Sequence, residues 1–161
     1  MSENNSRTFD LITLGQLLLR LSPPNNERLM RCDTFEKQVG GAELNVAVGV
    51  SLLGLHTGII SKLPSHDVGS FMKGKIRSYG VSDDFFIYDK SPSARVGIYY
   101  YENGAYPRKP KVIYDRANSS FYSLKIDEIP EEVYSATKCF HTSGITLALN
   151  HQVRETAIEM I

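Results

Sequence analysis

Two glycines stand at the start of a hydrophobic segment that is long enough to form a helix. Gly40-Gly41 is followed by Ala42-Glu43-Leu44-Asn45, so polar residues at positions 43 and 45 interrupt an otherwise apolar stretch. Glycine lets a ligand approach the backbone closely, and the first amides of a helix point outward as hydrogen-bond donors. Burying Glu43 or Asn45 without a partner would cost about 1–3 kcal/mol. The motif predicts either a ligand site or a tight turn whose polar groups are satisfied within the protein.

A second candidate group combines tyrosines with an arginine: Tyr99, Tyr101, Tyr106, Tyr114 and Arg116. A tyrosine offers a flat apolar face and one hydroxyl, which suits a sugar, and the planar guanidinium of Arg116 matches a carboxylate. Residues two apart share a face of a strand, so Tyr114 and Arg116 would lie together and could meet Tyr99 across a sheet. The alternative is that the aromatic residues only stabilise a small sheet and that Arg116 is a surface charge.

A third segment has glycines and lysines in a phosphate-binding pattern that is incomplete. Residues 69–76 read Gly-Ser-Phe-Met-Lys-Gly-Lys-Ile, with Ile76 where the phosphate loop requires Ser or Thr. The same residues carry apolar side chains at helical spacing, so we interpret the segment as an amphipathic helix and a nucleotide site there as the weaker alternative. The four histidines show no metal-ligand spacing, and the two cysteines lie too far apart in sequence to indicate a disulfide framework.

The composition excludes several classes of function. The 161 residues include 18 Lys+Arg and 18 Asp+Glu, so the net charge is zero and we expect no nucleic-acid partner. No apolar run reaches the length of about 18 residues that indicates a membrane span, so we expect no membrane partner. The polar N-terminus lacks the pattern of a secretory signal, which favours a cytoplasmic protein with reduced thiols.

The candidate residues need an α/β core to position them. Residues 42–53 are apolar on nearly every face, which predicts a helix buried on all sides and ended by Gly54. A strand before this helix and a strand after it imply a parallel βαβ unit. We expect core strands over residues 9–15, 57–63, 81–88 and 139–144, further helices over 67–79 and 151–161, and a disordered tail over 1–7.

Two insertions are expected to form a small sheet outside this core. Residues 17–38 read as two strands around a turn at Pro23-Pro24-Asn25-Asn26, and residues 94–101 and 111–115 read as an antiparallel pair. The predicted fold class is therefore α/β: a doubly wound, mostly parallel sheet with a small β-sheet inserted in two pieces, at about 17–38 and 93–118.

The last predicted helix and the small number of core strands indicate whether the sequence contains the whole fold. Asn150 is a capping residue for a last helix, but that helix has no stop signal before residue 161. The few expected core strands would leave one edge of the parallel sheet bare. This pattern favours part of a longer fold over a small domain whose last helix frays.

Together these motifs resemble the ribokinase-like (PfkB) carbohydrate kinases, and more narrowly the 2-keto-3-deoxygluconate kinases. The most specific block is Gly-Gly-Ala-Glu-x-Asn-Val-Ala at residues 40–47, and the resemblance covers nearly the whole chain after the tail. It implies that the small sheet is a lid over a sugar site and also makes a homo-oligomer contact. The other segments that carry the resemblance are residues 12–24, 53–55, 77–81 and 141–146.

The resemblance also implies which residues bind the substrate. Arg116 would hold a carboxylate, the lid tyrosines would hold hydroxyls, and Ile145 would flank the sugar. Gln16 departs from the pattern, because relatives often have Glu there, so an acidic contact is lost. The complete set implied to bind substrate is Gly40, Gly41, Asn45, Tyr99, Tyr114, Arg116 and Ile145.

The phosphoryl-transfer part of the family pattern does not occur in this sequence. The family's Gly-Ala-Gly-Asp block supplies an aspartate that accepts the proton of the attacking hydroxyl and helix-start amides that bind the transferred phosphate. The resemblance therefore places the catalytic aspartate, ATP and Mg²⁺ beyond residue 161. It predicts the sugar-binding half of a kinase that transfers the ATP γ-phosphate to 2-keto-3-deoxygluconate or a related sugar. The alternative is a non-catalytic sugar-acid binding or dimerisation module.

Overall fold

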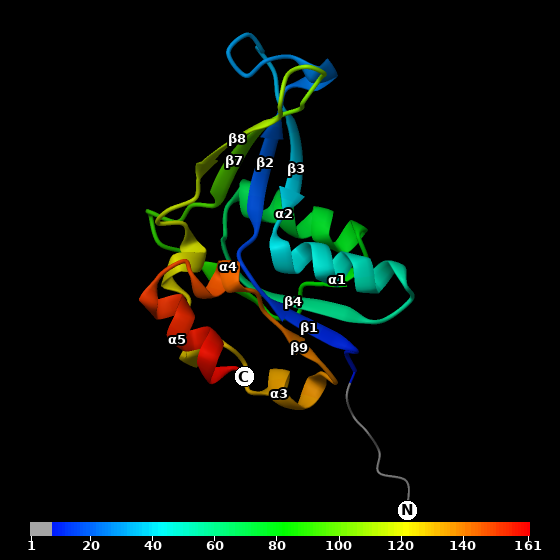
Figure 1. Ribbon diagram of the computed structural model, residues 1–161. Coiled ribbons are helices and arrows are strands. Elements are labelled where there is room, and N and C mark those ends of the chain that lie inside the picture. Colours follow the sequence, from blue (N-terminus) through cyan, green and yellow to red (C-terminus); the bar gives the residue numbers. More distant parts are fainter. Residues whose placement is uncertain (1–7) are drawn as a thin grey trace, which may run out of the picture.

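A mostly parallel sheet forms the base of the molecule in the computed structural model, which describes residues 8–161 (Figure 1). The tail expected at residues 1–7 lies outside the described residues. The strand order is β5-β4-β1-β9, with β6 also paired to β4, and every one of these pairs is parallel. The strands are β1 (Leu11–Leu14), β4 (Thr57–Pro64), β5 (Val81–Ser82), β6 (Phe86–Asp89) and β9 (Phe140–His141).

The sequence predicted which segments form the core strands better than it predicted their lengths. The segment expected to form one strand over residues 81–88 is divided into β5 and β6, because Phe86 N–H donates to the Asp83 carbonyl in a turn between them. The strand expected over residues 139–144 pairs with β1 only at Phe140 and His141, because residues 144–147 turn into a short helix.

Helices cover both faces of this sheet, and side-chain alternation along the strands supplies a separate core to each face. Ile12, Leu14 and Ile60 pack with Val153 and Ala157 on one face, and Ile59 packs with the other group of helices on the opposite face. In Figure 1 α1 and α2 lie on one side of the sheet and α5 on the other. The helices are α1 (Ala42–Leu52), α2 (Asp67–Ser78), α3 (Glu132–Ala136), α4 (Gly144–Leu147) and α5 (His151–Glu159), with short 3-10 helices at Pro24–Asn26, Ser120–Ser123 and Ile126–Glu128.

The prediction that the helix after the two glycines is buried on all sides is wrong. Leu44 and Ala47 are buried against the sheet, whereas Leu52 and Leu53 are each 80% exposed and Val46 is 38% exposed. The apolar composition correctly indicated a helix, but composition does not report how many faces of a helix meet packing partners.

The incomplete phosphate-loop pattern lies inside α2, as the helical spacing predicted. Its first glycine packs closely on the preceding strand, because a Cβ at Gly69 would overlap the carbonyl oxygen of Pro64. Met72 and Ile76 are fully buried on the same side of the helix. Gly69 is thus required for helix–strand packing, and its amide lies within a helix instead of a ligand-binding loop.

A second, four-stranded sheet stands apart from the core, at the top of Figure 1, and we call it the second sheet. It joins the two insertions in one sheet, as expected from the sequence, and its strand order is β3-β2-β7-β8. The central pair β2–β7 is parallel, and the flanking pairs β2–β3 and β7–β8 are antiparallel. The strands are β2 (Leu18–Ser22), β3 (Glu36–Gly40), β7 (Gly97–Glu102) and β8 (Lys111–Asp115).

Across residues 8–161, none of the helices combines the length and the hydrophobicity that crossing a membrane would require.

Candidate functional site

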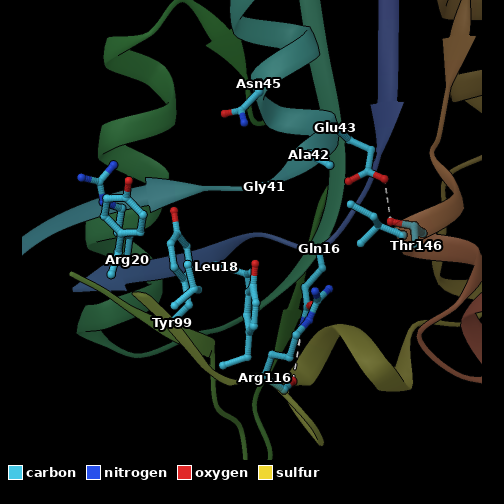
Figure 2. A pocket seen from close by; sticks show the side chains of 14 residues that line it. Gln16, Leu18, Arg20, Gly41, Ala42, Glu43, Asn45, Tyr99, Arg116 and Thr146 are labelled. Carbon is cyan, nitrogen blue, oxygen red and sulfur yellow. Dashed lines mark hydrogen bonds between the residues drawn. The ribbon is translucent and has the colours of Figure 1, made fainter. Parts of the chain in front are cut away.

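A cavity of about 300 Å³ lies where one face of the second sheet meets the loops that follow β1, β3 and β9 (Figure 2). The loops after β1 and β9 lie at the carboxyl-terminal edge of the core strands, which is where ligands bind in open α/β sheets. The second sheet contributes Leu18, Arg20, Tyr99, Tyr101, Val112, Tyr114 and Arg116 to the wall. The core contributes Gln16, Gly41, Ala42, Glu43, Asn45, Ile145 and Thr146.

Strand register brings the aromatic side chains of the second sheet onto the cavity face. Arg20 pairs with Tyr99, and Tyr99 pairs with Tyr114, so the three side chains form one row across β2, β7 and β8. The ring centroids of Tyr99 and Tyr114 are 5.8 Å apart. The sequence-based expectation that these tyrosines meet across a sheet is therefore confirmed.

Tyr99 reaches over β2 toward the start of α1. A Cβ at Gly40 would lie only 2.7 Å from the Tyr99 hydroxyl oxygen, so the glycine leaves the space that this hydroxyl occupies. Burial, the largest influence, raises the pKa of the Tyr99 phenol, although the nearby Arg20 opposes the change. Tyr99 therefore stays protonated and can donate as well as accept a hydrogen bond.

The guanidinium of Arg116 donates hydrogen bonds to the neutral side-chain amide of Gln16. Its Nε and Nη2 donate to Oε1 of Gln16 at 2.9 and 2.5 Å. The Gln16 Nε2 in turn donates to Oγ of Ser119 at 2.7 Å. Among residues 8–161, Arg116 takes part in none of the ion pairs, so its charge has no carboxylate partner there.

The opposite wall of the cavity contains a buried carboxylate. Glu43, in the first turn of α1, accepts hydrogen bonds on Oε1 from the Ser143 hydroxyl at 2.5 Å, the Ser143 amide at 3.2 Å and the Thr146 hydroxyl at 2.8 Å. Oε1 of Glu43 thus finds its partners within the protein, which is one of the alternatives that the sequence left open. Figure 2 shows Glu43 and Thr146 on one side of the cavity and Tyr99 on the other.

Arg20 is a second cation on the cavity wall. Its Nε donates to Oγ of Ser22 at 2.9 Å, and its guanidinium carbon lies 4.8 Å from the ring centroid of Tyr101. Both contacts hold the side chain along the face of the second sheet, at the far end of the cavity from Arg116 in Figure 2.

All of the predicted site residues except Gly40 line this cavity. Gly40 is buried beneath Tyr99, and because it has no side chain it leaves room for the Tyr99 hydroxyl. Asn45 and Ile145 are exposed at the cavity wall. Of the other polar wall residues, Tyr101 and Glu43 had been considered as candidates without being assigned to the substrate, and Gln16 had been noted only as a departure from the family pattern. Arg20 and Thr146 were missed as site candidates.

Only some of the missed residues left a signal in the sequence. Arg20 lies two residues after Leu18 in β2, so period-two alternation could have placed both on the cavity face. The hydrogen bonds of Glu43 to Thr146 and of Gln16 to Arg116 span 103 and 100 residues, and no local pattern indicates such contacts.

The fold and the cavity define a class, namely an α/β protein with a polar cavity between its core and a second, four-stranded sheet. The family model of the pfkB family carbohydrate kinases matches residues 8–161, and the chain belongs to this family.

Several sugar kinases are similar to this chain in sequence or in structure. It is 39% identical over 154 residues to a 2-dehydro-3-deoxygalactonokinase of Haloferax volcanii, covering 96% of this chain and 48% of the relative. The crystal structure of 2-dehydro-3-deoxygluconokinase from Thermotoga maritima matches with a TM-score of 0.88 at 35% identity, covering 94% of this chain and 46% of that one. A sugar kinase from Pyrococcus horikoshii, solved in complex with ATP, matches with a TM-score of 0.80 at 26% identity, covering 93% and 48% of the two chains. The chain thus spans about half the length of the relatives it matches.

Proposed function

We propose that this chain provides the sugar-binding half of an ATP-dependent kinase whose substrate is a 2-keto-3-deoxy sugar acid. The proposal is supported by membership of the pfkB family and by similarity to kinases named for 2-dehydro-3-deoxy sugar acids. The cavity volume of about 300 Å³ lies at the lower end of the range of small-molecule sites.

The observation that carries the proposal is the position of Arg116. Its guanidinium has no carboxylate partner within residues 8–161, and Arg116 lines a cavity together with Tyr99 and Tyr114. A sugar acid carries a carboxylate and several hydroxyls, so it matches both kinds of group. We assign Arg116 to the carboxylate, the two tyrosines and Asn45 to hydroxyls, and Gly41 and Ile145 to the walls beside the sugar.

ATP and Mg²⁺ are the further requirements of phosphoryl transfer, because the metal neutralises charge on the transferred phosphate. Within residues 8–161, no three or more His, Cys, Asp or Glu side chains cluster in a way that could hold a metal ion. We therefore assign none of the residues of this chain to Mg²⁺. We propose that both sites belong to the half of the relatives that this chain does not span.

We also propose that the second sheet makes a homo-oligomer contact. All five residues of β8 are exposed, and β8 is the last strand of its sheet, so its outer backbone edge is free to pair. Ile113, which points away from the cavity face that Val112 lines, adds apolar surface at 44% exposure. Analytical ultracentrifugation should show an assembly that Ile113→Lys dissociates, and a monomer at all concentrations would contradict this contact.

Calorimetric titration with 2-keto-3-deoxygluconate tests the substrate site directly. Arg116→Ala should weaken binding by about 1.5–3 kcal/mol, because it removes hydrogen bonds from a charged group. Arg31→Ala is the matched control, since Arg31 is exposed and does not line the cavity. Unchanged affinity in Arg116→Ala would exclude the assigned role of the arginine.

A phosphorylation assay separates the kinase proposal from the alternative of a sugar-binding module. We expect the 161-residue chain to bind the sugar acid without consuming ATP. Joining it to the second half of a pfkB kinase such as the Thermotoga relative should produce ATP-dependent phosphorylation of the acid. If such a fusion folds and binds the acid but transfers no phosphate, a non-catalytic binding module is the better description.

A further inference from the structure

We propose that one flank of α1 and the outer edge of β9 form a docking surface for the second half of the pfkB fold, the part that this chain does not span. The inference rests on the proposed function, which treats the chain as one half of a kinase, and it adds where the two halves meet. The docking surface consists of Val46, Val50 and Leu53 on α1 together with Phe140 and His141 on β9.

The flank of α1 that faces β9 can be identified from Glu43. The carboxylate of Glu43 accepts two hydroxyl hydrogen bonds from the segment that directly follows β9. The next residues on the same flank of the helix, at spacings of three or four, are Val46, Val50 and Leu53. These three side chains therefore lie on the side of α1 nearest to β9.

This flank is apolar although much of it is open to solvent. Leu53 is 80% exposed, Val46 is 38% exposed and Val50 is half-buried. Glu43 is the one charged residue of α1 and is itself buried, so the helix adds no exposed charge beside these side chains. An exposed helix face with apolar side chains and no charge indicates contact with another protein segment.

β9 is the outermost strand at one side of the core sheet, and its outer edge pairs with no strand in the described part of the chain. Neither Phe140 nor His141 is buried, whereas all four residues of the neighbouring strand β1 are. Phe140 packs toward the core that includes α5, so strand alternation directs His141 to the face that carries α1. Strands of a parallel sheet are ordinarily covered on both faces, so a further strand and a further helix would complete the surroundings of β9.

A cavity of about 300 Å³ lies beside this free edge and is lined by Phe140, His141, Thr142, Met160 and Ile161. Met160 belongs to the buried core on the α5 side of the sheet, so the cavity lies where that core ends. Ile161 is largely exposed. An apolar side chain from an added strand would fill this space and extend the core past β9.

A strand connected to a helix is the partner that covers both parts of the docking surface. α1 packs on β1 and β4, and β9 lies on the opposite side of β1 from β4 (Figure 1). A strand paired with β9 and a helix laid over β9 beside α1 would thus cover the free edge and the apolar flank together, and parallel strands are usually joined by such helices. We assign this unit to the second half of the kinase fold, because the chain covers only 48% of the Haloferax relative and 46% of the Thermotoga structure.

Thiol labelling tests whether the edge of β9 becomes covered. The 161-residue chain, alone and joined to the second half of the Thermotoga relative, is treated with N-ethylmaleimide, and the labelled peptides are identified by mass spectrometry. The exposed Cys139 precedes β9, and the half-buried Cys32 between β2 and β3 is the internal control. We expect the second half to slow labelling of Cys139 roughly tenfold or more, because a covered thiol reacts only when the halves open, and to leave Cys32 unchanged.

The flank of α1 has a matched pair of test positions. Leu52 and Leu53 are equally exposed neighbours at the end of the helix, but Leu52 is not on the flank that continues from Glu43. In the joined protein the thiol of Leu53→Cys should be protected, whereas that of Leu52→Cys should react as it does in the 161-residue chain.

Equal labelling of Cys139 and of the Leu53→Cys thiol in the chain and in a folded joined protein would overturn the inference. So would a second half that protease digests while the first half still binds 2-keto-3-deoxygluconate, because the halves would then not be docked. Protection that already appears in the unjoined chain and rises with its concentration would assign the surface to a second copy instead. Thiol protection without phosphorylation of the acid would leave the docking surface standing and contradict the proposed function.

Discussion

The carboxylate of Glu43 and the hydroxyl of Thr146 are joined by a hydrogen bond of 2.8 Å across 103 residues of sequence. The same carboxylate oxygen accepts a hydrogen bond from the Ser143 hydroxyl. The Thr142 hydroxyl donates a hydrogen bond to the carbonyl oxygen of Leu14 at the end of β1. The first turn of α1, the end of β1 and the loop after β9 are therefore held together. Ile145 lies between Ser143 and Thr146, so these bonds also fix one wall of the cavity.

Removing the Thr146 hydroxyl should destabilise the chain. Thr146→Val keeps the shape of the side chain but deletes one donor to a buried carboxylate, and hydrogen bonds to charged groups contribute about 1.5–3 kcal/mol. Urea denaturation should show a decrease of that size in the free energy of unfolding. Thr34→Val, at an exposed position, is the control and should change it by less than about 0.5 kcal/mol. Equal stability of the two variants would mean that the bond contributes nothing measurable.

Two glycines of α2 should respond in opposite directions to alanine. A Cβ at Gly69 would overlap the Pro64 carbonyl oxygen, so Gly69→Ala should cost about 1–3 kcal/mol by forcing the helix away from β4. Gly74 has open space around it in the same helix, so Gly74→Ala should stabilise by about 0.5–1 kcal/mol. Thermal unfolding of both variants, with and without ATP, provides the measurement. If ATP specifically stabilises α2, the segment binds a nucleotide, and its interpretation as a purely structural helix is wrong.

Periodicity predicted the elements of the fold because each signal is local. The alternating side chains of β7 and β8 placed Tyr99 opposite Tyr114, and the capping side chain of Asn150 starts α5 by accepting from the Val153 amide. The burial of α1 could not be predicted in the same way. Leu52 and Leu53 satisfy the same hydrophobic pattern as Leu44, and only the placement of the sheet determines which of them finds a partner.

The candidate site was predictable in its residue types and less so in its supporting contacts. Arg116 and the tyrosines were identified from their chemistry, and strand alternation put them on one face. Gln16 was recognised only as a departure from the family pattern. Its hydrogen bonds to Arg116 and Ser119 could not be predicted, because they depend on how the end of β1 meets the loop after β8. Long-range contacts of this kind require the folded arrangement.

Gly40 offers a test of the space beneath Tyr99. Gly40→Ala would place a Cβ 2.7 Å from the Tyr99 hydroxyl oxygen, and the end of the tyrosine side chain must move to accommodate it. If Tyr99 binds a sugar hydroxyl as proposed, affinity for 2-keto-3-deoxygluconate should fall by about 0.5–1.5 kcal/mol, the contribution of one hydrogen bond. Gly49→Ala is the control, because nothing lies within 4 Å of the added carbon. The assignment of Tyr99 fails if calorimetry gives the same affinity for both variants.

Ionisation of Asp10 should make the free energy of unfolding depend on pH. A hydrogen bond from Lys138, at 2.7 Å, is the largest cause of the lowered pKa of the Asp10 carboxyl, and the His56 amide adds a second bond at 2.9 Å. A carboxyl whose folded-state pKa lies below its unfolded value stabilises the protein above the unfolded value, near pH 4. This contribution is lost as the pH falls through the folded-state pKa.

The corresponding variant is Asp10→Asn, compared with Asp127→Asn at an exposed position. At neutral pH Asp10→Asn should melt at a lower temperature than the unmodified chain, and the difference should shrink as the pH falls below about 4 and both forms approach the same melting temperature. Asp127→Asn should follow the unmodified chain over the whole range. A difference between Asp10→Asn and the unmodified chain that stays constant from neutral to acidic pH would show that ionisation of Asp10 is not its source.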